Sequence, residues 1–143
     1  MAINFDNFFN SQSKKSKMGD FQDLEHLDGI SVSTTSAKLY NNSRDDVVMF
    51  YFRKGANHAS VYTQSKIVSE NIKWNLLLKK KRISALIVNA RNANAFTGDS
   101  GKKSVRDLAS STAQLVGCHP KQVFVAQTGV IGEEFLAKKV TEK

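Results

Sequence analysis

The sequence has 143 residues, of which 41% are hydrophobic and 24% are charged, and these proportions fit one globular domain or a piece of a larger one. Its 21 Lys and Arg residues against 13 Asp and Glu give a formal net charge of +8, which raises nucleic-acid binding as one function to consider. The single cysteine excludes an internal disulfide and a cysteine-based metal site, and no apolar stretch reaches the ~18 residues that a membrane-spanning helix needs.

Residues 1–27 form the most polar part of the chain, with Ser, Asn, Gln and Lys crowded together. We expect them to be a loosely ordered extension, because they have little apolar surface to bury. They show no secretory signal pattern, so we expect a cytoplasmic protein without membrane contact. Residues 28–143 have the composition of a folded domain.

Short β-rich segments come next. Ile30 and Val32 alternate with polar neighbours, and residues 47–52 are an apolar run of strand length. Residues 54–57 fit a turn, after which residues 59–63 are expected to return as another strand.

The segment from Ile67 to Leu78 is ambiguous. Residues 70–74 fit a strand, with Asn75 capping a short helix behind it. Residues 83–88 are a nearly unbroken apolar run, which is the pattern of a strand buried on both faces. A loop rich in Asn and small residues, 89–101, follows that strand.

The clearest helix lies between residues 104 and 117, where apolar side chains recur with a period of 3.6 residues. Its buried face is predicted to comprise Val105, Leu108, Ala109, Thr112, Leu115 and Val116. Gly117 and Pro120 end the helix. Residues 122–126 then form a strand, and residues 133–140 begin a further helix. This alternation of strands and helices predicts an α/β fold.

Several candidate sites fail on their spacing. Residues 97–104 lie between a strand and a helix, where a phosphate-binding loop would sit, but Phe96 and Lys103 occupy positions that the motif reserves for Gly and for Ser or Thr. Cys118 and His119 are adjacent in sequence, and a catalytic pair is usually brought together by the fold, so a small apolar Cys closing the helix is favoured.

The remaining polar candidates are also weak. His26 and His58 have no partners at metal-ligand spacing. The basic run 79–82 fits the solvated end of a helix, and no interleaved aromatic residues support a nucleic-acid patch there.

Two segments stand out. Residues 85–98, ALIVNARNANAFTG, are a buried strand entering a loop of Asn and Ala, and residues 123–132, VFVAQTGVIG, are a strand ending in Thr-Gly. Asn tolerates left-handed backbone, and Gly allows tight geometry in which free N–H groups point into a cavity. A plain strand-to-loop transition at both places is the competing interpretation.

These segments resemble the signature stretches VVN(S/A)GNANA(C/F)TG and STGVIG of the ornithine acetyltransferases, the ArgJ-type bifunctional glutamate N-acetyltransferases. The predicted helix fills the interval between them. Upstream, residues 44–49 resemble the family's +DL.L strand, and residues 61–66 resemble its VFT.N+ segment. The four motifs occur in the family's order, from about Gly29 to the C-terminus.

The resemblance implies an α/β layered sandwich, which the family shares with self-processing aminopeptidases and which would be incomplete here. It implies transfer of an acetyl group from N-acetylornithine to glutamate, with no cofactor and with acetyl-CoA as a further substrate in some members. It also implies a precursor that cleaves itself at an Ala-Thr bond into α and β segments, which assemble as an α2β2 heterotetramer.

Thr128 and Gly129 match the family's oxyanion hole, in which backbone N–H groups hold the negative oxygen of the tetrahedral intermediate. We therefore expect replacement of Gly129 to harm turnover more than folding. No segment resembles the cleavage site that carries the nucleophilic Thr, so the resemblance implies the N-terminal part of such an enzyme, inactive by itself.

The chain also departs from the family pattern. Arg91 and Lys38 stand where Gly is usual, and Ser65 stands where Asn is usual. An Arg in place of Gly is strained if the backbone there needs a positive φ. Two alternatives stay open, namely a small basic nucleic-acid-binding protein and a self-processing aminopeptidase-like relative, although the NANAFTG loop disfavours the second.

Overall fold

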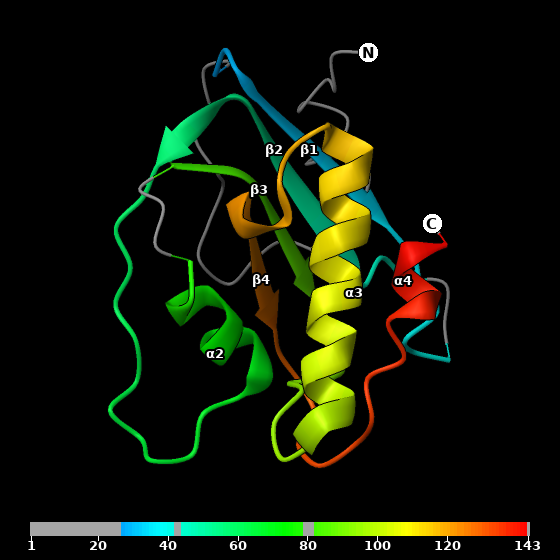
Figure 1. Ribbon diagram of the computed structural model, residues 1–143. Helices are drawn as coiled ribbons and strands as arrows, with labels where there is room; N and C mark the ends of the chain where they lie inside the picture. Colours follow the sequence, from blue (N-terminus) through cyan, green and yellow to red (C-terminus); the bar gives the residue numbers. More distant parts are fainter. Residues whose placement is uncertain (1–26, 42–43, 79–81, 143) are drawn as a thin grey trace, which may run out of the picture.

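Four strands form one mixed sheet with helices packed against it (Figure 1). The structure is a computed structural model that describes residues 27–41, 44–78 and 82–142. The strands lie side by side in chain order as β1 (Ile30–Thr35), β2 (Val47–Asn57), β3 (Arg82–Asn89) and β4 (Val123–Gln127). The β1–β2 and β2–β3 pairs are antiparallel, whereas β3 and β4 are parallel and are joined through the helix α3 (Gly98–Val116). The predicted α/β class is confirmed.

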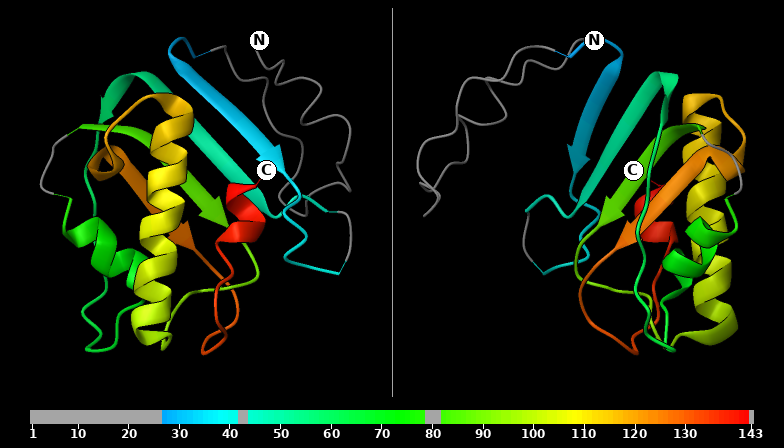
Figure 2. Two further views of the ribbon diagram at one scale, coloured as in Figure 1. Left: turned by 45° about the vertical axis from the view of Figure 1, so that its right-hand side comes forward. Right: turned by 90° about the vertical axis from the view of Figure 1, so that its left-hand side faces the viewer.

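The core lies between the sheet and α3, which crosses one face of the sheet (Figure 2). Side chains of β3 alternate in burial, so Ala85 and Ile87 are buried while Leu86 and Val88 are only half-buried. The expectation that this strand is buried on both faces is therefore wrong. The helix α3 covers the face that carries Ala85 and Ile87, whereas Leu86 on the other face packs against a smaller cluster formed by Leu78, Ile83 and Phe124.

The α3 helix confirms most of the buried face predicted from hydrophobic periodicity, but the prediction is wrong for Leu115, which lies at the margin of that face and is 74% exposed. Val105, Leu108 and Ala109 are almost completely buried, and Gly117 ends the helix in the left-handed conformation at φ 69°. The helix begins at Gly98, several residues earlier than expected, because residues of the predicted loop contribute its first turns.

Strand β2 continues through the predicted turn. Its register with β3 shifts between Tyr51 and Ala56, and Gly55 adopts a φ of 67° within that irregularity. Between the Tyr51–Ala85 and Ala56–Ile83 pairs β2 advances five residues and β3 two, so β2 carries three extra residues there and still regains its partner. Residues 59–63 form no strand, so the predicted return strand is wrong.

The ambiguous segment is the helix α2 (Glu70–Leu76). Asn75 does not cap it. The Asn75 side chain instead donates from Nδ2 to the Val125 carbonyl oxygen (2.9 Å) and accepts from the Val125 N–H (3.1 Å). Trp74 Nε1–H donates to the Val123 carbonyl oxygen (3.1 Å). These side chains take the place of a neighbouring strand, so α2 closes the edge of β4.

The C-terminal segment is mostly irregular. Its short helix α4 covers only Lys138–Thr141, fewer residues than the predicted 133–140. Phe135 is buried, and its carbonyl oxygen accepts a hydrogen bond from Ser104 Oγ (2.8 Å). Tertiary contacts with α3 therefore fix residues that periodicity assigned to a helix. A 3₁₀ turn, η1 (Pro120–Gln122), links α3 to β4.

Some expectations fall outside the described residues. They are the polar extension before Leu27, including His26, and most of the basic run at residues 79–81. Within the described ranges, no helix has both the length and the apolarity to cross a membrane. The same ranges contain no group of three or more His, Cys, Asp or Glu side chains placed to hold a metal ion.

Candidate functional site

Two loops meet where β3 and β4 end. Because these strands are parallel neighbours, their carboxyl ends lie at one edge of the sheet, where ligands bind in many α/β proteins. We call residues 90–97 the first loop and residues 128–133 the second loop. They pair in parallel through a bridge between Asn92 and Val130, with hydrogen bonds from Val130 N–H to Arg91 O (2.8 Å) and from Ala93 N–H to Val130 O (3.0 Å). The two signature segments of the sequence are thus brought together.

Gly129 occupies a position that no other residue fits. Its φ is 137°, and a Cβ built on it would lie 2.1 Å from the carbonyl carbon and 2.2 Å from the carbonyl oxygen of Arg91. Contacts that short cannot occur, so the two backbones approach each other only because Gly has no side chain. A side chain at Gly129 would therefore disturb folding as well as the site, and the expectation that turnover suffers more than folding stays a prediction.

The donors predicted for the oxyanion hole differ from one another. The Thr128 N–H donates to the Asn89 carbonyl oxygen (3.1 Å), which continues the ladder between β3 and β4. It is therefore not free to bind a ligand, and the prediction that both backbone N–H groups form the hole is wrong for Thr128. The Gly129 N–H has no hydrogen-bond acceptor among the described residues, and both residues are exposed. The Thr128 hydroxyl likewise makes no hydrogen bond to a described residue.

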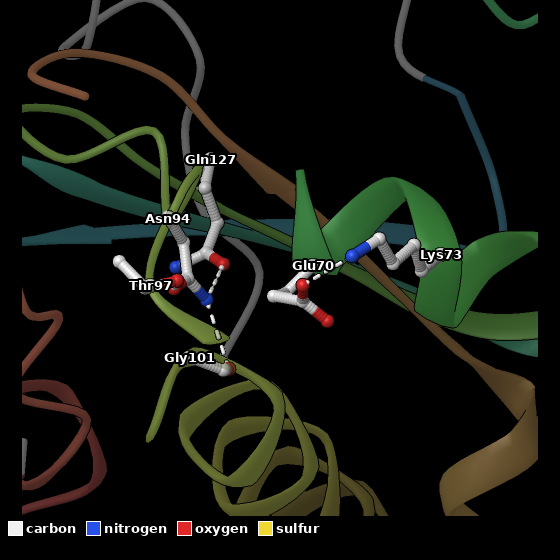
Figure 3. A network of polar contacts seen from close by, with 6 residues as sticks. All are labelled: Glu70, Lys73, Asn94, Thr97, Gly101 and Gln127. Carbon is white, nitrogen blue, oxygen red and sulfur yellow. Dashed lines mark hydrogen bonds and ion pairs between the residues drawn. The ribbon is translucent and has the colours of Figure 1, made fainter. Parts of the chain in front are cut away.

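A buried network of side-chain amides holds the two loops from beneath (Figure 3). Asn94 is fully buried, and its Nδ2 donates to the Gly101 carbonyl oxygen (3.1 Å) and to Gln127 Oε1 (2.9 Å). Its Oδ1 accepts from Thr97 Oγ1 (2.7 Å). Gln127 Nε2 in turn donates to Asn89 Oδ1 (2.8 Å). The ends of β3 and β4 and the start of α3 are thereby fixed to one another.

Sequence reasoning missed this network. The expected turn bond is present, since Asn92 Oδ1 accepts the Asn94 N–H (2.7 Å), but the Asn94 side chain also bonds to Gln127, which is far away along the chain. The network also requires Gly at position 101, because a Cβ there would lie 1.9 Å from Thr97 Oγ1 and 2.4 Å from Asn94 Oδ1. A buried Asn that needs Gly at a distant position shows no pattern in a single sequence.

The helix α2 also reaches the site. The Glu70 N–H donates to the Asn94 carbonyl oxygen (3.0 Å), and the Glu70 carboxylate pairs with Lys73 one turn further along (Figure 3). The side chain of Glu70 is 10% exposed and that of Lys73 is 55% exposed. Asn94 of the first loop is therefore held both by the backbone of α2 and by the Gln127 side chain of β4.

The other candidate residues from the sequence, near the start of α3 and at the histidines, make structural contacts. Near the N-terminus of α3, Ser100 Oγ donates to the Glu134 carboxylate, so the chain itself places a negative charge where a phosphate-binding loop would place its ligand. His58 packs edge-on against Phe124, with ring centroids 4.4 Å apart. His119 Nδ1 accepts the Lys121 N–H (3.1 Å) and caps the 3₁₀ turn.

Cys118 does not form a catalytic pair with its neighbour. Its Sγ lies 3.6 Å from the His119 carbonyl oxygen, and the His119 ring bonds elsewhere. Partial burial raises the pKa of the Cys118 thiol above its usual value, which outweighs a lowering contact with Ser84. A raised pKa leaves less thiolate, so the residue is a poor nucleophile.

Two of the departures from the family pattern have a positive φ. Arg91 has a φ of 75° and Lys38 a φ of 54°, both in the left-handed region that favours Gly. Ser65 lies in an exposed segment, where its Oγ accepts the Ile67 N–H (3.2 Å).

Residues 31–143 match the ArgJ family model. The chain is 39% identical over 118 residues to the arginine biosynthesis bifunctional protein ArgJ of Bradyrhizobium diazoefficiens, which covers 82% of this chain and 29% of that protein. A protein of the same name from Rhizobium meliloti is 39% identical over 122 residues, covering 83% of this chain and 29% of that protein. The chain thus spans less than a third of the length of these relatives.

Solved structures share the fold. The crystal structure of an ArgJ protein from Bacillus halodurans aligns with a TM-score of 0.76 and 26% identity, covering 80% of this chain and 61% of that chain. An ornithine acetyltransferase from Mycobacterium tuberculosis, solved with ornithine, has the same TM-score at 21% identity and covers 80% and 63% of the two chains. The predicted fold, part of the layered α/β architecture of this family, is confirmed.

Proposed function

We propose, because the chain belongs to the ArgJ family, that its two paired loops form the oxyanion-stabilising part of an acetyltransferase of arginine biosynthesis. The enzyme would move an acetyl group from N-acetylornithine to glutamate. One observation carries the proposal. Gly129 is an exposed residue whose N–H has no acceptor among the described residues, at a point where only Gly fits between two loops fixed by buried amides.

The reaction would follow the acyl-Thr route that family membership suggests. A Thr hydroxyl attacks the acetyl carbonyl carbon, and the electron pair of the C=O bond moves to its oxygen. The resulting oxyanion collapses and expels the ornithine amine, which takes up the proton lost by the hydroxyl. The glutamate amine then attacks the acetyl-Thr ester by the same route and restores the Thr. Both tetrahedral intermediates carry the negative oxygen that the loops would bind.

Two donors of this chain would hold that oxygen. One is the Gly129 N–H. The second is the Thr128 hydroxyl, since the Thr128 N–H already donates to the Asn89 carbonyl oxygen. Because the loops are fixed before any ligand binds, such donors need no reorganisation during the reaction. Each typically contributes ~10²–10³ in rate.

The nucleophilic Thr would come from outside the 143 residues, in a partner segment with which these loops assemble. These 143 residues contain no Ala-Thr pair that resembles the family's cleavage site. We therefore expect the purified 143-residue chain to show no acetyl transfer from N-acetylornithine or acetyl-CoA to glutamate. Turnover that persists through repurification would contradict this part of the proposal.

A chimera tests the proposed donors. Residues 31–143 would replace the aligned segment of the Bradyrhizobium relative, and acetyl transfer would be measured with the parent chimera and with Thr128→Val and Thr128→Ser. We expect Thr128→Val to lower kcat by ~10²–10³, as loss of one oxyanion donor does, and Thr128→Ser to retain most activity. Thr141→Val, in the distant α4, is the control. If Thr128→Val matches the parent, the hydroxyl is not a donor.

A further inference from the structure

Arg91 holds an unusual backbone conformation beside the proposed oxyanion donor. Residues other than Gly, Asn and Asp rarely adopt its φ of 75°. Strain of this kind persists only where surrounding contacts impose it, and it concentrates at functional sites. The contacts of Arg91 should therefore show what imposes this conformation.

The Arg91 side chain crosses from the first loop to the second. Its Nη1 lies 2.9 Å from Oε2 of Glu133, and the two side chains are 34% and 52% exposed. The Nη1 atom itself is buried, and the pair is an ion contact without the alignment of a hydrogen bond. Beside it, Asn92 Nδ2 donates to the Glu133 carbonyl oxygen (2.9 Å), so Glu133 is held through both its backbone and its charge.

The Arg91 backbone controls where Gly129 sits. Its carbonyl group is the surface against which Gly129 packs, and the same carbonyl oxygen accepts the Val130 N–H (2.8 Å). A shift of Arg91 therefore moves Gly129, whose N–H is the proposed oxyanion donor. Catalytic donors lose much of their effect when misplaced by as little as an ångström.

We propose that the Arg91–Glu133 ion pair is a clamp that sets the register of the two loops, which makes Arg91 a positioning residue for the Gly129 N–H. The catalytic part of this inference rests on the proposed function, whereas the clamp itself is a property of the chain. An exposed ion pair usually adds little to overall stability. The clamp should accordingly act on the loops and leave the core unchanged.

Amide hydrogen exchange tests the clamp in the ¹⁵N-labelled 143-residue chain. Glu133→Gln removes the charge and keeps the shape of the side chain. We expect it to accelerate exchange of the Val130 and Ala93 amides, which bridge the loops, by about tenfold or more, while Val125 in β4 is unchanged. Equal exchange of the loop amides in both proteins would overturn the proposal, as would a uniform acceleration across loops and core.

Variants at Arg91 separate the charge from the backbone. Arg91→Lys retains the positive charge and should keep slow loop exchange, whereas Arg91→Gly relieves the strain, loses the pair and should exchange as Glu133→Gln does. If Arg91→Gly leaves the loop amides as protected as in the parent, the backbone alone sets the register and the clamp is disproved. Raising the salt concentration should reproduce the Glu133→Gln effect in the parent only.

Kinetics of the chimera test the positioning role. With the donors misplaced, Glu133→Gln should lower kcat about tenfold or more at nearly unchanged KM, as expected of a pair that positions a donor and does not itself bind substrate. An effect confined to KM would contradict the positioning role. An inactive parent chimera would count against the acetyltransferase proposal, and the exchange result would still decide whether the clamp exists.

Discussion

The helix-backed core and the paired loops are built on different principles. In the core, α3 packs Val105, Leu108 and Ala109 against β3 and β4, and apolar contact supplies the stability. At the loops, buried amides and close backbone approaches replace apolar contact. Strain is concentrated there too. Of the four non-Gly residues with positive φ in the described part of the chain, three lie in the first loop: Arg91, Asn94 and Phe96.

The core and the loops should therefore respond differently to mutation. An apolar core accepts changes that preserve volume, whereas a site held by a few directional bonds fails when one of them is lost. Core variants should therefore lower global stability without moving the loops, and loop variants should disturb the site first. The following variants test that contrast, from the largest expected effect to the smallest.

Gly129→Ala should damage both the loops and the activity. The new Cβ would collide with the Arg91 backbone in a conformation that already disfavours Ala, so we expect a loss of roughly 2–5 kcal/mol in the free energy of unfolding. Turnover of the chimera should fall at least as far as for loss of one oxyanion donor, ~10²–10³. Urea denaturation and acetyl-transfer assays would measure the two effects.

Gly132→Ala is the matched control for Gly129→Ala. Gly132 lies in the same loop with a φ of 81°, but a Cβ there would meet no atom within 4 Å. The loss in the free energy of unfolding should be limited to the cost of placing Ala in a left-handed backbone conformation, ~1–2 kcal/mol. Equal losses for the two variants would show that contact with Arg91 is unimportant.

Leu108→Ala tests the core. The side chain is 1% exposed, so its removal leaves a cavity and should lower the free energy of unfolding by ~2–4 kcal/mol. Chemical shifts of the Gly129 and Val130 amides should stay close to those of the parent below the unfolding transition. Large shifts at these loop amides would mean that core and loops are not independent.

Asn94→Ala tests the amide network. It leaves Gln127 Oε1, the Gly101 carbonyl and the Thr97 hydroxyl without their partner, so we expect a loss of ~1–3 kcal/mol. Unlike Leu108→Ala, it should also perturb the loop amides. Asn57→Ala, at an exposed position at the end of β2, should change stability by less than ~0.5 kcal/mol.

Asn75→Ala tests the covered edge of β4. Losing both hydrogen bonds to Val125 should cost ~1–2 kcal/mol and expose a strand edge that promotes self-association, which size-exclusion chromatography would detect. Asn75→Asp keeps the acceptor for the Val125 N–H and should lose less. An equal loss for both variants would show that the bond accepted from the Val125 N–H contributes nothing.

Cys118 should give the smallest effect. Because burial raises the pKa of its thiol, alkylation by iodoacetamide should be slower than for a free cysteine peptide at the same pH. The folded state holds this proton more tightly than the unfolded state. The thiol's contribution to stability is therefore complete below the unfolded pKa of about 9 and is lost as the pH rises through the folded value. Cys118→Ser should abolish that alkaline decline.

The sequence by itself determined the α/β class, the position of α3 and the resemblance of two signature segments to one family. These features depend on local periodicity and on short motifs, because burial of one helix face or of a strand leaves a repeating pattern in neighbouring residues. The strand at residues 122–126 and the helix stop at Gly117 were predictable for the same reason.

Only the tertiary structure decided which polar groups are free. The sequence could not show that the Thr128 N–H is bonded to Asn89, that Asn75 covers the edge of β4, or that Arg91 pairs with Glu133. Likewise, the length of β2 and the irregular backbone around Phe135 follow from contacts with distant segments. A hydrogen-bond partner far along the chain leaves no trace in local periodicity, so donors and acceptors can be assigned only once the fold has brought them together.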